Sequence, residues 1–264
     1  MTRFLCLAGV LLAVPVAAPA QQAETGFLNR TVTLNGVQHR YQVYVPAEYA
    51  GSDLRWPVIL FLHGAGERGA DGLRQTLVGL PAQIRESPSR YPAIVVMPQV
   101  PEDSSWIGLY SDVAIAALDR TLAEFRADPD RVYLTGLSMG GNGTWHLAYR
   151  FPERFAALAV VCGYVSPPSE RVSGWRGAVP ADSGDVFVTL ARRVSRLPAW
   201  VAHGETDPLV PVTESRRAVE ALRAAGATVR YVEYLGVGHF VWDPTYSSPQ
   251  FTEWLFAQRR TGIP

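Results

Sequence analysis

Short runs of apolar, β-branched residues alternate with helical patterns along most of this chain, and this alternation restricts the possible folds more than any other sequence feature. Each run ends at turn residues, as strands that are covered on both faces do. Strand–helix alternation is typical of a mainly parallel, doubly wound sheet, whose site lies in loops at the carboxyl ends of the strands. The runs are residues 57–62, 93–97, 131–135, 158–162, 199–203 and 228–234.

Helical patterns and a hairpin complete the predicted architecture. Residues 111–125 and 213–226 each place their apolar side chains on one side of a helix. Residues 30–46 alternate β-formers around Asn35-Gly36, which favours two antiparallel strands joined by a tight turn. The sequence therefore predicts one α/β domain over residues 21–264, with a mainly parallel twisted sheet, an antiparallel hairpin at its start and helices on both faces.

Residues 1–20 have the layout of a cleavable signal peptide. Arg3 precedes an apolar run, and Ala18-Pro19-Ala20 supplies the small residues expected before a cleavage site. The run from Phe4 is about eleven residues long, short of the roughly twenty that span a bilayer, so we expect no stable membrane insertion. These features predict a secreted or periplasmic protein.

Composition excludes several classes of partner and chemistry. The chain has 24 basic and 24 acidic residues, so it lacks the basic excess that nucleic-acid binding requires. Every basic residue is arginine, which excludes a lysine Schiff base and a phosphate-loop lysine. Without residues 1–20, Cys162 is the only cysteine and has no intramolecular disulfide partner. No cofactor or metal is implied, and the oligomeric state is left open.

Ser138 lies in GLSMG, between the predicted strand 131–135 and a helical stretch that begins NGTWHLAYR. A bare G-x-S-x-G is common by chance, but a strand-to-helix context is the one in which such a serine becomes an exposed nucleophile on a strained turn. Glycines two residues before and after it would remove clashing side chains. The backbone N–H of Met139 would then point at the same spot.

A serine nucleophile needs a base, and the sequence has five histidines. His39 lies in the hairpin and is expected at the surface, and His146 lies on the helix after Ser138, where it would be packed or solvated. His63 and His203 each close a strand and more typically pin a loop. His239 lies in LGVGHFVWD after the last predicted strand, where a loop side chain could reach Ser138.

The base in turn needs a carboxylate that orients it. Asp207, in HGETDPLVP directly after a strand, is favoured over Asp243, which is so close to His239 that it would more plausibly cap the next turn. The order Ser, Asp, His is the one that α/β-hydrolases use. The glycine-dense loop LHGAGERGADG, residues 62–72, could present backbone N–H groups to an oxyanion, although a flexible turn, a hairpin or a phosphate loop are alternatives. The phosphate-loop alternative lacks its lysine.

Together, HGAGERGADG, GLSMGGNGTW, HGETDPLVP and GVGHFVWD resemble secreted α/β-hydrolases of the esterase and "predicted peptidase" type. These are related to feruloyl and acetyl-xylan esterases, polyhydroxybutyrate depolymerases and the phospholipase/carboxylesterase group. The likeness covers about residues 28–260 and implies the α/β-hydrolase fold. It implies a nucleophile at Ser138, an acid at Asp207, a base at His239, and oxyanion N–H donors at Met139 and Ala65.

Two tryptophans are candidates for the substrate cleft. The resemblance places Trp106 in a loop that can line the cleft, although a tryptophan at the edge of the core is equally compatible. Residues 163–198 form a longer connection than expected and include Trp175. This connection could be a lid, a cleft wall or an ordinary surface excursion.

The sequence thus predicts a secreted serine hydrolase that cleaves small or polymeric carboxylic esters through an acyl-enzyme. A serine peptidase of the prolyl-oligopeptidase type would use the same residues, and nothing in the sequence separates the two. A binding domain that keeps the fold without the chemistry is the third alternative.

Overall fold

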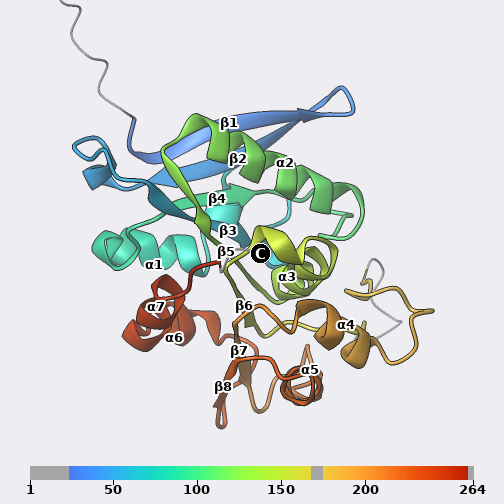
Figure 1. Cartoon of the computed structure of the whole chain (residues 1–264). Helices are drawn as coiled ribbons and strands as arrows, with labels where there is room; N and C mark the ends of the chain where they lie inside the picture. Colours follow the sequence, from blue (N-terminus) through green and yellow to red (C-terminus); the bar gives the residue numbers. More distant parts are fainter. Residues whose placement is uncertain (1–23, 168–174, 261–264) are drawn as a thin grey trace, which may run out of the picture.

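The computed structural model describes residues 24–167 and 175–260, which form one eight-stranded sheet (Figure 1). The strand order is β1-β2-β4-β3-β5-β6-β7-β8. β2 is antiparallel to both of its neighbours, and all pairs from β4 to β8 are parallel. The strands are β1 (Gly26–Leu34), β2 (Val37–Val45), β3 (Trp56–Leu62), β4 (Ile94–Pro98), β5 (Ala127–Leu137), β6 (Ala157–Val161), β7 (Ala199–Gly204) and β8 (Val229–Tyr234).

The hairpin at the start of the sheet has the predicted two-residue turn. Leu34 pairs with Val37, and the residues between them, Asn35 and Gly36, have φ angles of 52° and 77°. Positive φ at both central positions matches the twist of the flanking strands, which is why Asn-Gly is favoured there. The mainly parallel sheet with an antiparallel start is therefore confirmed.

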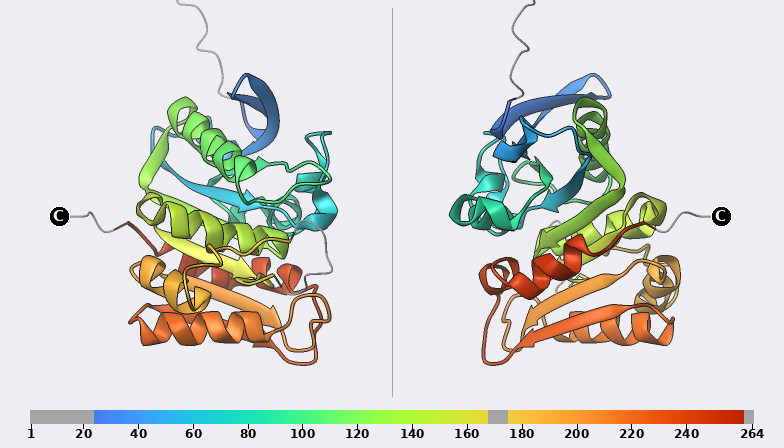
Figure 2. Two further views of the ribbon diagram at one scale, coloured as in Figure 1. Left: turned by 90° about the vertical axis from the view of Figure 1, so that its right-hand side faces the viewer. Right: turned by 60° about the vertical axis from the view of Figure 1, so that its left-hand side comes forward.

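Helices cover both faces of the sheet (Figure 2). β3 shows how its alternating side chains serve two cores: Val58, Leu60 and Leu62 belong to one apolar cluster, whereas Ile59 and Phe61 belong to the other. In the described part of the chain, no helix is both long and apolar enough to cross a membrane. One face carries α2 (Leu109–Glu124), α3 (Met139–Arg150), α4 (Val186–Val194) and α5 (Thr213–Ala224), and the other carries α1 (Leu80–Glu86), α6 (Trp242–Tyr246) and α7 (Pro249–Phe256).

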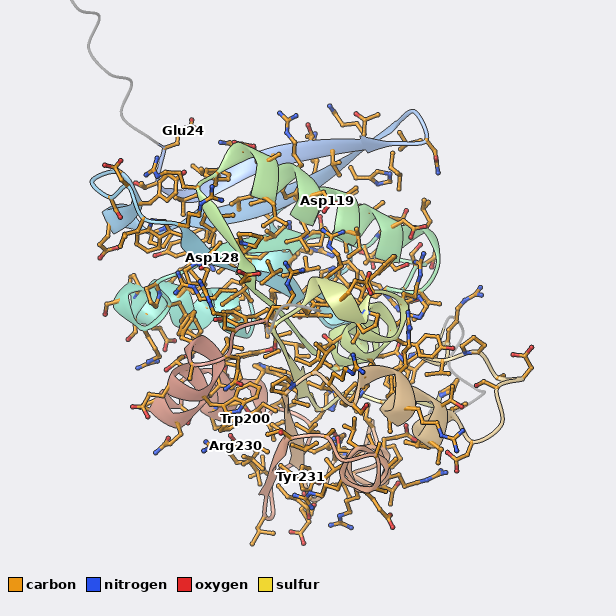
Figure 3. All side chains as sticks on the ribbon, in the orientation of Figure 1. Glu24, Asp119, Asp128, Trp200, Arg230 and Tyr231 are labelled. Carbon is orange, nitrogen blue, oxygen red and sulfur yellow. The ribbon has the colours of Figure 1, made fainter. Side chains whose placement is uncertain are left out.

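The last strand was predicted to be covered on both faces, and this prediction was wrong. β8 is the edge of the sheet, and its residues are only half-buried or exposed. Arg230 is paired with Trp200 of β7, and its guanidinium carbon lies 5.7 Å from the centroid of that indole ring (Figure 3). Charged side chains on an edge strand oppose pairing with another chain, so β8 combines an apolar pattern with an exposed position.

The long connection 163–198 contains an ordinary crossover helix, α4. Its buried residues Phe187, Leu190, Ala191 and Val194 recur at helical spacing, and α4 packs against α3 and α5. Asp185 accepts hydrogen bonds from the backbone N–H groups of Phe187 and Val188 and caps the helix. Residues 168–174 of the connection, like residues 1–20, lie outside the described residues.

Strand order determines which loops meet at the carboxyl edge of the sheet. β3 and β5 are neighbours, with Leu62 paired to Gly136, so the loops that begin at residues 63 and 138 start side by side. β7 and β8 are also neighbours, with Gly204 paired to Tyr234, which places the loops of Asp207 and His239 together. Two pairs of adjacent loops therefore flank the end of β6.

Candidate active site

Ser138 occupies a sharp turn between β5 and α3. Its φ of 53° and ψ of −116° are unusual for a residue with a side chain. A Cβ on Gly140 would lie 1.9 Å from the backbone oxygen of Leu62, and one on Gly136 would lie 2.3 Å from the oxygen of Gly140. Both flanking positions therefore require glycine, because the end of β3 presses against the turn.

Ser138, His239 and Asp207 form a continuous hydrogen-bonded chain. The Nε2 atom of His239 lies 2.9 Å from Ser138 Oγ, and its Nδ1 atom lies 2.6 Å from Asp207 Oδ2. A carboxylate only accepts, so Nδ1 carries the proton and Nε2 is left to accept the serine hydroxyl proton. His239 is 6% exposed, and its ring meets Trp242 edge-on with centroids 5.7 Å apart.

Asp207 is held in its ionised form within a closed turn. Its Oδ1 accepts hydrogen bonds from the backbone N–H groups of Leu209 and Val210, both at 2.9 Å. Burial opposes ionisation, but hydrogen bonds from His203, His239 and Val210 outweigh it and hold the pKa of Asp207 far below its usual range. The carboxylate is therefore a fixed negative charge beneath His239.

Two buried side chains, His63 and Trp106, hold the loop after β3 in place through hydrogen bonds. His63 Nδ1 donates to the oxygen of Gly64 at 2.6 Å, and its Nε2 accepts from the N–H of Val100 at 3.0 Å. Burial lowers the pKa of His63 to about 4, so the ring is neutral at pH 7. His63 pins this loop, as the sequence predicts. In the same loop, Ala65 begins the short 3-10 helix η2 (Ala65–Glu67). Met139, after Ser138, begins α3.

Trp106 takes part in this support and does not line an open cleft. Its side chain is fully buried, and its indole N–H donates to the backbone oxygen of His63 at 2.9 Å. Trp106 packs against Gly143 of α3 and meets the His63 ring edge-on. The prediction of a cleft residue was wrong, because this indole lies beneath the loop and offers no surface to a substrate.

The remaining sequence candidates lie apart from Ser138. His39 is half-buried beside Tyr110, and His146 is packed with its Nδ1 donating to the oxygen of Ala178 at 2.9 Å. Asp243 is exposed on the first turn of α6. Within the described residues, the carboxylate that reaches His239 is therefore Asp207.

Sequence reasoning missed two residues beside the site. The guanidinium of Arg68, in the loop after β3, places Nη2 3.0 Å from Met139 Sδ. Tyr164 follows β6, is 1% exposed, and stacks on the half-buried Trp175 with centroids 4.9 Å apart. Their only sequence signal is a position shortly after a strand, which many residues share. Over the described ranges 24–167 and 175–260, no group of three His, Cys, Asp or Glu side chains is arranged to hold a metal ion.

The family model described as "Putative esterase" matches residues 34–254. The chain belongs to this esterase family. Among solved structures, a thermostable esterase superposes with a TM-score of 0.72 at 36% identity, over 89% of this chain and 63% of that one. The family and this neighbour confirm the α/β-hydrolase fold of the esterase type that the four sequence motifs imply.

Curated relatives match over shorter regions. Carboxylesterase SOBER1 of Arabidopsis thaliana is 26% identical over 126 residues, which is 48% of this chain and 48% of that protein. A protein of Arthroderma benhamiae described as an uncharacterized secreted protein is 25% identical over 199 residues, 70% of this chain and 21% of that protein. This chain thus spans less than half the length of both relatives.

Proposed function

We propose that this member of the esterase family is a serine hydrolase that cleaves carboxylic esters through an acyl-enzyme. The observation that carries the proposal is the chain of hydrogen bonds from Ser138 Oγ through His239 to Asp207, with lengths of 2.9 and 2.6 Å. These lengths lie within the hydrogen-bonding reach that a nucleophile, its base and the orienting carboxylate require.

Each residue has one task in the reaction. Ser138 Oγ attacks the ester carbonyl carbon while His239 Nε2 takes the hydroxyl proton, and Asp207 stabilises the imidazolium that forms. Backbone N–H groups of Met139 and Ala65 hold the tetrahedral oxyanion. Collapse of this intermediate expels the alcohol, which receives the proton from His239. Water then attacks the acyl-enzyme with His239 again as base, and the acid product leaves.

Exposed apolar side chains near the acid and base favour an ester with an apolar part. Leu209, Leu235 and Phe240 are 57%, 76% and 70% exposed, and all three lie on the loops that carry Asp207 and His239. These two loops are joined by a hydrogen bond from the N–H of Thr206 to the oxygen of Val237. We include Trp175 in the substrate cleft, because its half-exposed ring rests on Tyr164 at the neighbouring end of β6.

The decisive test is the Ser138→Ala variant, assayed on a short-chain p-nitrophenyl ester. We expect kcat to fall by roughly a million-fold, because the base and acid cannot act without the nucleophile. Ser195→Ala, at the residue that follows the last turn of α4, is the matched control and should keep the full rate. A fluorophosphonate probe should label the native protein and not Ser138→Ala. Near-normal turnover by Ser138→Ala would refute the proposal.

A peptide p-nitroanilide series run beside the esters separates the two hydrolase classes. An esterase should hydrolyse the ester and leave the peptide anilide of the matched acyl group uncleaved. Efficient turnover of the anilide, which has an amine leaving group, would instead favour the peptidase alternative.

We also propose that residues 1–20 are removed during export. Ala18-Pro19-Ala20 supplies the small residues of a cleavage site before Gln21, and the description of the Arthroderma relative as secreted agrees with export. Amino-terminal sequencing of protein recovered outside the cytoplasm should begin at Gln21. Recovery of the intact chain with Met1 in the cytoplasm would contradict this part of the proposal.

A further inference from the structure

A second imidazole contacts the carboxylate of Asp207 at the oxygen that accepts from His239. His203 lies in β7, is fully buried, and places Nε2 3.2 Å from Asp207 Oδ2. We propose that His203 is a positioning residue that orients the carboxylate of Asp207 for catalysis. This inference rests on the proposed function, because it concerns the acid of that reaction.

The neighbours of His203 determine where its proton lies. Nε2 is 3.0 Å from the backbone oxygen of Val210, and a carbonyl oxygen only accepts, so Nε2 carries a proton and donates. The same nitrogen lies 3.2 Å from Asp207 Oδ2. At the other side of the ring, Nδ1 is 2.7 Å from the hydroxyl of Ser215 on α5, which is 1% exposed. In the tautomer with its proton on Nε2, Nδ1 accepts a hydrogen bond from this hydroxyl, so both ring nitrogens have a partner.

His203 thereby fixes the turn that carries the acid. Val210 donates its N–H to Asp207 Oδ1 and receives the His203 N–H on its oxygen. One imidazole thus contacts both Asp207 Oδ2, which also accepts from His239, and the peptide whose N–H binds Oδ1. Because Ser215 belongs to a packed helix, this arrangement is anchored outside the loop.

An independent anchor matters because His239 must itself be oriented. Oδ1 of Asp207 has two backbone donors, whereas the side chains of the described residues that contact Oδ2 are those of His239 and His203. Without His203, Oδ2 would be positioned by the backbone bonds on Oδ1 and by the ring that it has to orient. His203 touches no reacting atom, and its ring is held on both nitrogens, so its role is orientation and not proton transfer.

Two substitutions of similar size separate orientation from simple filling of the core. In His203→Gln the amide nitrogen replaces Nε2 and keeps a donor towards Asp207, whereas in His203→Asn the amide nitrogen replaces Nδ1 and reaches only Ser215. We expect His203→Asn to lower kcat on the p-nitrophenyl ester by about 10- to 100-fold with little change in KM. His203→Gln should stay within about threefold of the native kcat. Equal losses in the two variants would refute an orienting role.

The second arm repeats His203→Asn in the Asp207→Asn background. If His203 acts through the carboxylate, the added substitution should change the residual kcat by less than about twofold, because residues that act as a unit are non-additive. A further loss as large as in the native background would overturn the proposal. If His203→Asn does not fold, Ser215→Ala loosens the same ring and should lower kcat several-fold in the native background alone. An unchanged kcat in Ser215→Ala would then count against it.

These outcomes are separable from failure of the proposed function. If native protein lacks ester turnover, or Ser138→Ala retains it, the hydrolase proposal fails first. If native protein is active, Ser138→Ala is inactive and His203→Asn is fully active, only the role of His203 is refuted.

Discussion

Replacing Asp207 with asparagine isolates the orienting carboxylate with the least change in shape. The side-chain oxygen of asparagine can still accept from the N–H groups of Leu209 and Val210, so the turn should survive. Its NH₂ group would face the two imidazoles where a carboxylate oxygen now accepts. His239 must then turn its unprotonated nitrogen towards residue 207 and present an N–H to Ser138, which cannot take the hydroxyl proton.

The expected loss follows from this reversal. The wrong tautomer of a triad histidine costs about 10⁴-fold in kcat, or about 5.5 kcal/mol of transition-state stabilisation. Stability should change less, by about 3 kcal/mol, because the lost interactions are the charge-assisted bonds on Oδ2 alone. We would measure kcat on the p-nitrophenyl ester together with the free energy of unfolding in urea.

Asp243→Asn is the matched control, since it removes an exposed carboxylate four residues beyond His239. It should leave kcat unchanged. The reasoning would be refuted if Asp207→Asn kept its kcat within tenfold of the native value, or if Asp243→Asn lost as much. Either result would mean that a different group orients His239.

Three further predictions concern the turn, the buried ring and the cleft. Gly140→Ala should destabilise the protein by more than about 3 kcal/mol in urea unfolding, because its Cβ would lie 1.9 Å from the oxygen of Leu62; a stable, active variant would contradict the strained turn. His63 is neutral in the folded protein, because burial lowers its pKa to about 4. Its contribution to folding stability is therefore complete above the unfolded pKa of about 6.5 and is lost as the pH falls from there towards 4. That loss amounts to at most about 3 kcal/mol of the free energy of unfolding. Between pH 7 and 4, His63→Gln should therefore lose less stability than the native protein. Equal losses in the two proteins would show that His63 is not the source of the pH dependence. Trp175→Ala should raise KM for aromatic esters more than for acetate esters at similar kcat, and an unchanged KM ratio would remove Trp175 from the cleft.

Much of the fold follows from patterns that lie within one element. The strand runs and the Asn35-Gly36 hairpin are found where their local residues predict them, because each pattern depends on neighbours in sequence. The edge position of β8 was missed, because the burial of a strand depends on which strands flank it and not on its own residues. α4 was missed because Gly, Pro and Ser on its amino-terminal side obscure a short amphipathic pattern.

The candidate site, too, could be predicted from the sequence only in part. Ser138 and the glycines around it could be inferred from one short motif, and Asp207 and His239 from their positions after strands. Trp106 was misplaced because the sequence gives its loop but not the direction of its side chain, which turns inward to the oxygen of His63. The contact of His203 with Asp207 also depends on the turn that brings residue 210 back to β7, and no spacing rule predicts it.

β6 separates the strands that carry the nucleophile and the acid, and this sets the width that the reaction must bridge. Neighbouring strands lie about 4.8 Å apart, so β5 and β8 are roughly 14 Å apart at the sheet. His239 still reaches Ser138 because the loop after β8 folds back over the end of β7, where a Cβ on Gly204 would lie 2.0 Å from the oxygen of Gly238. β6 contributes none of the proposed reacting groups, yet together with β7 it sets the distance between β5 and β8. Substitutions that shift β6 sideways are therefore expected to alter catalysis without touching a catalytic side chain.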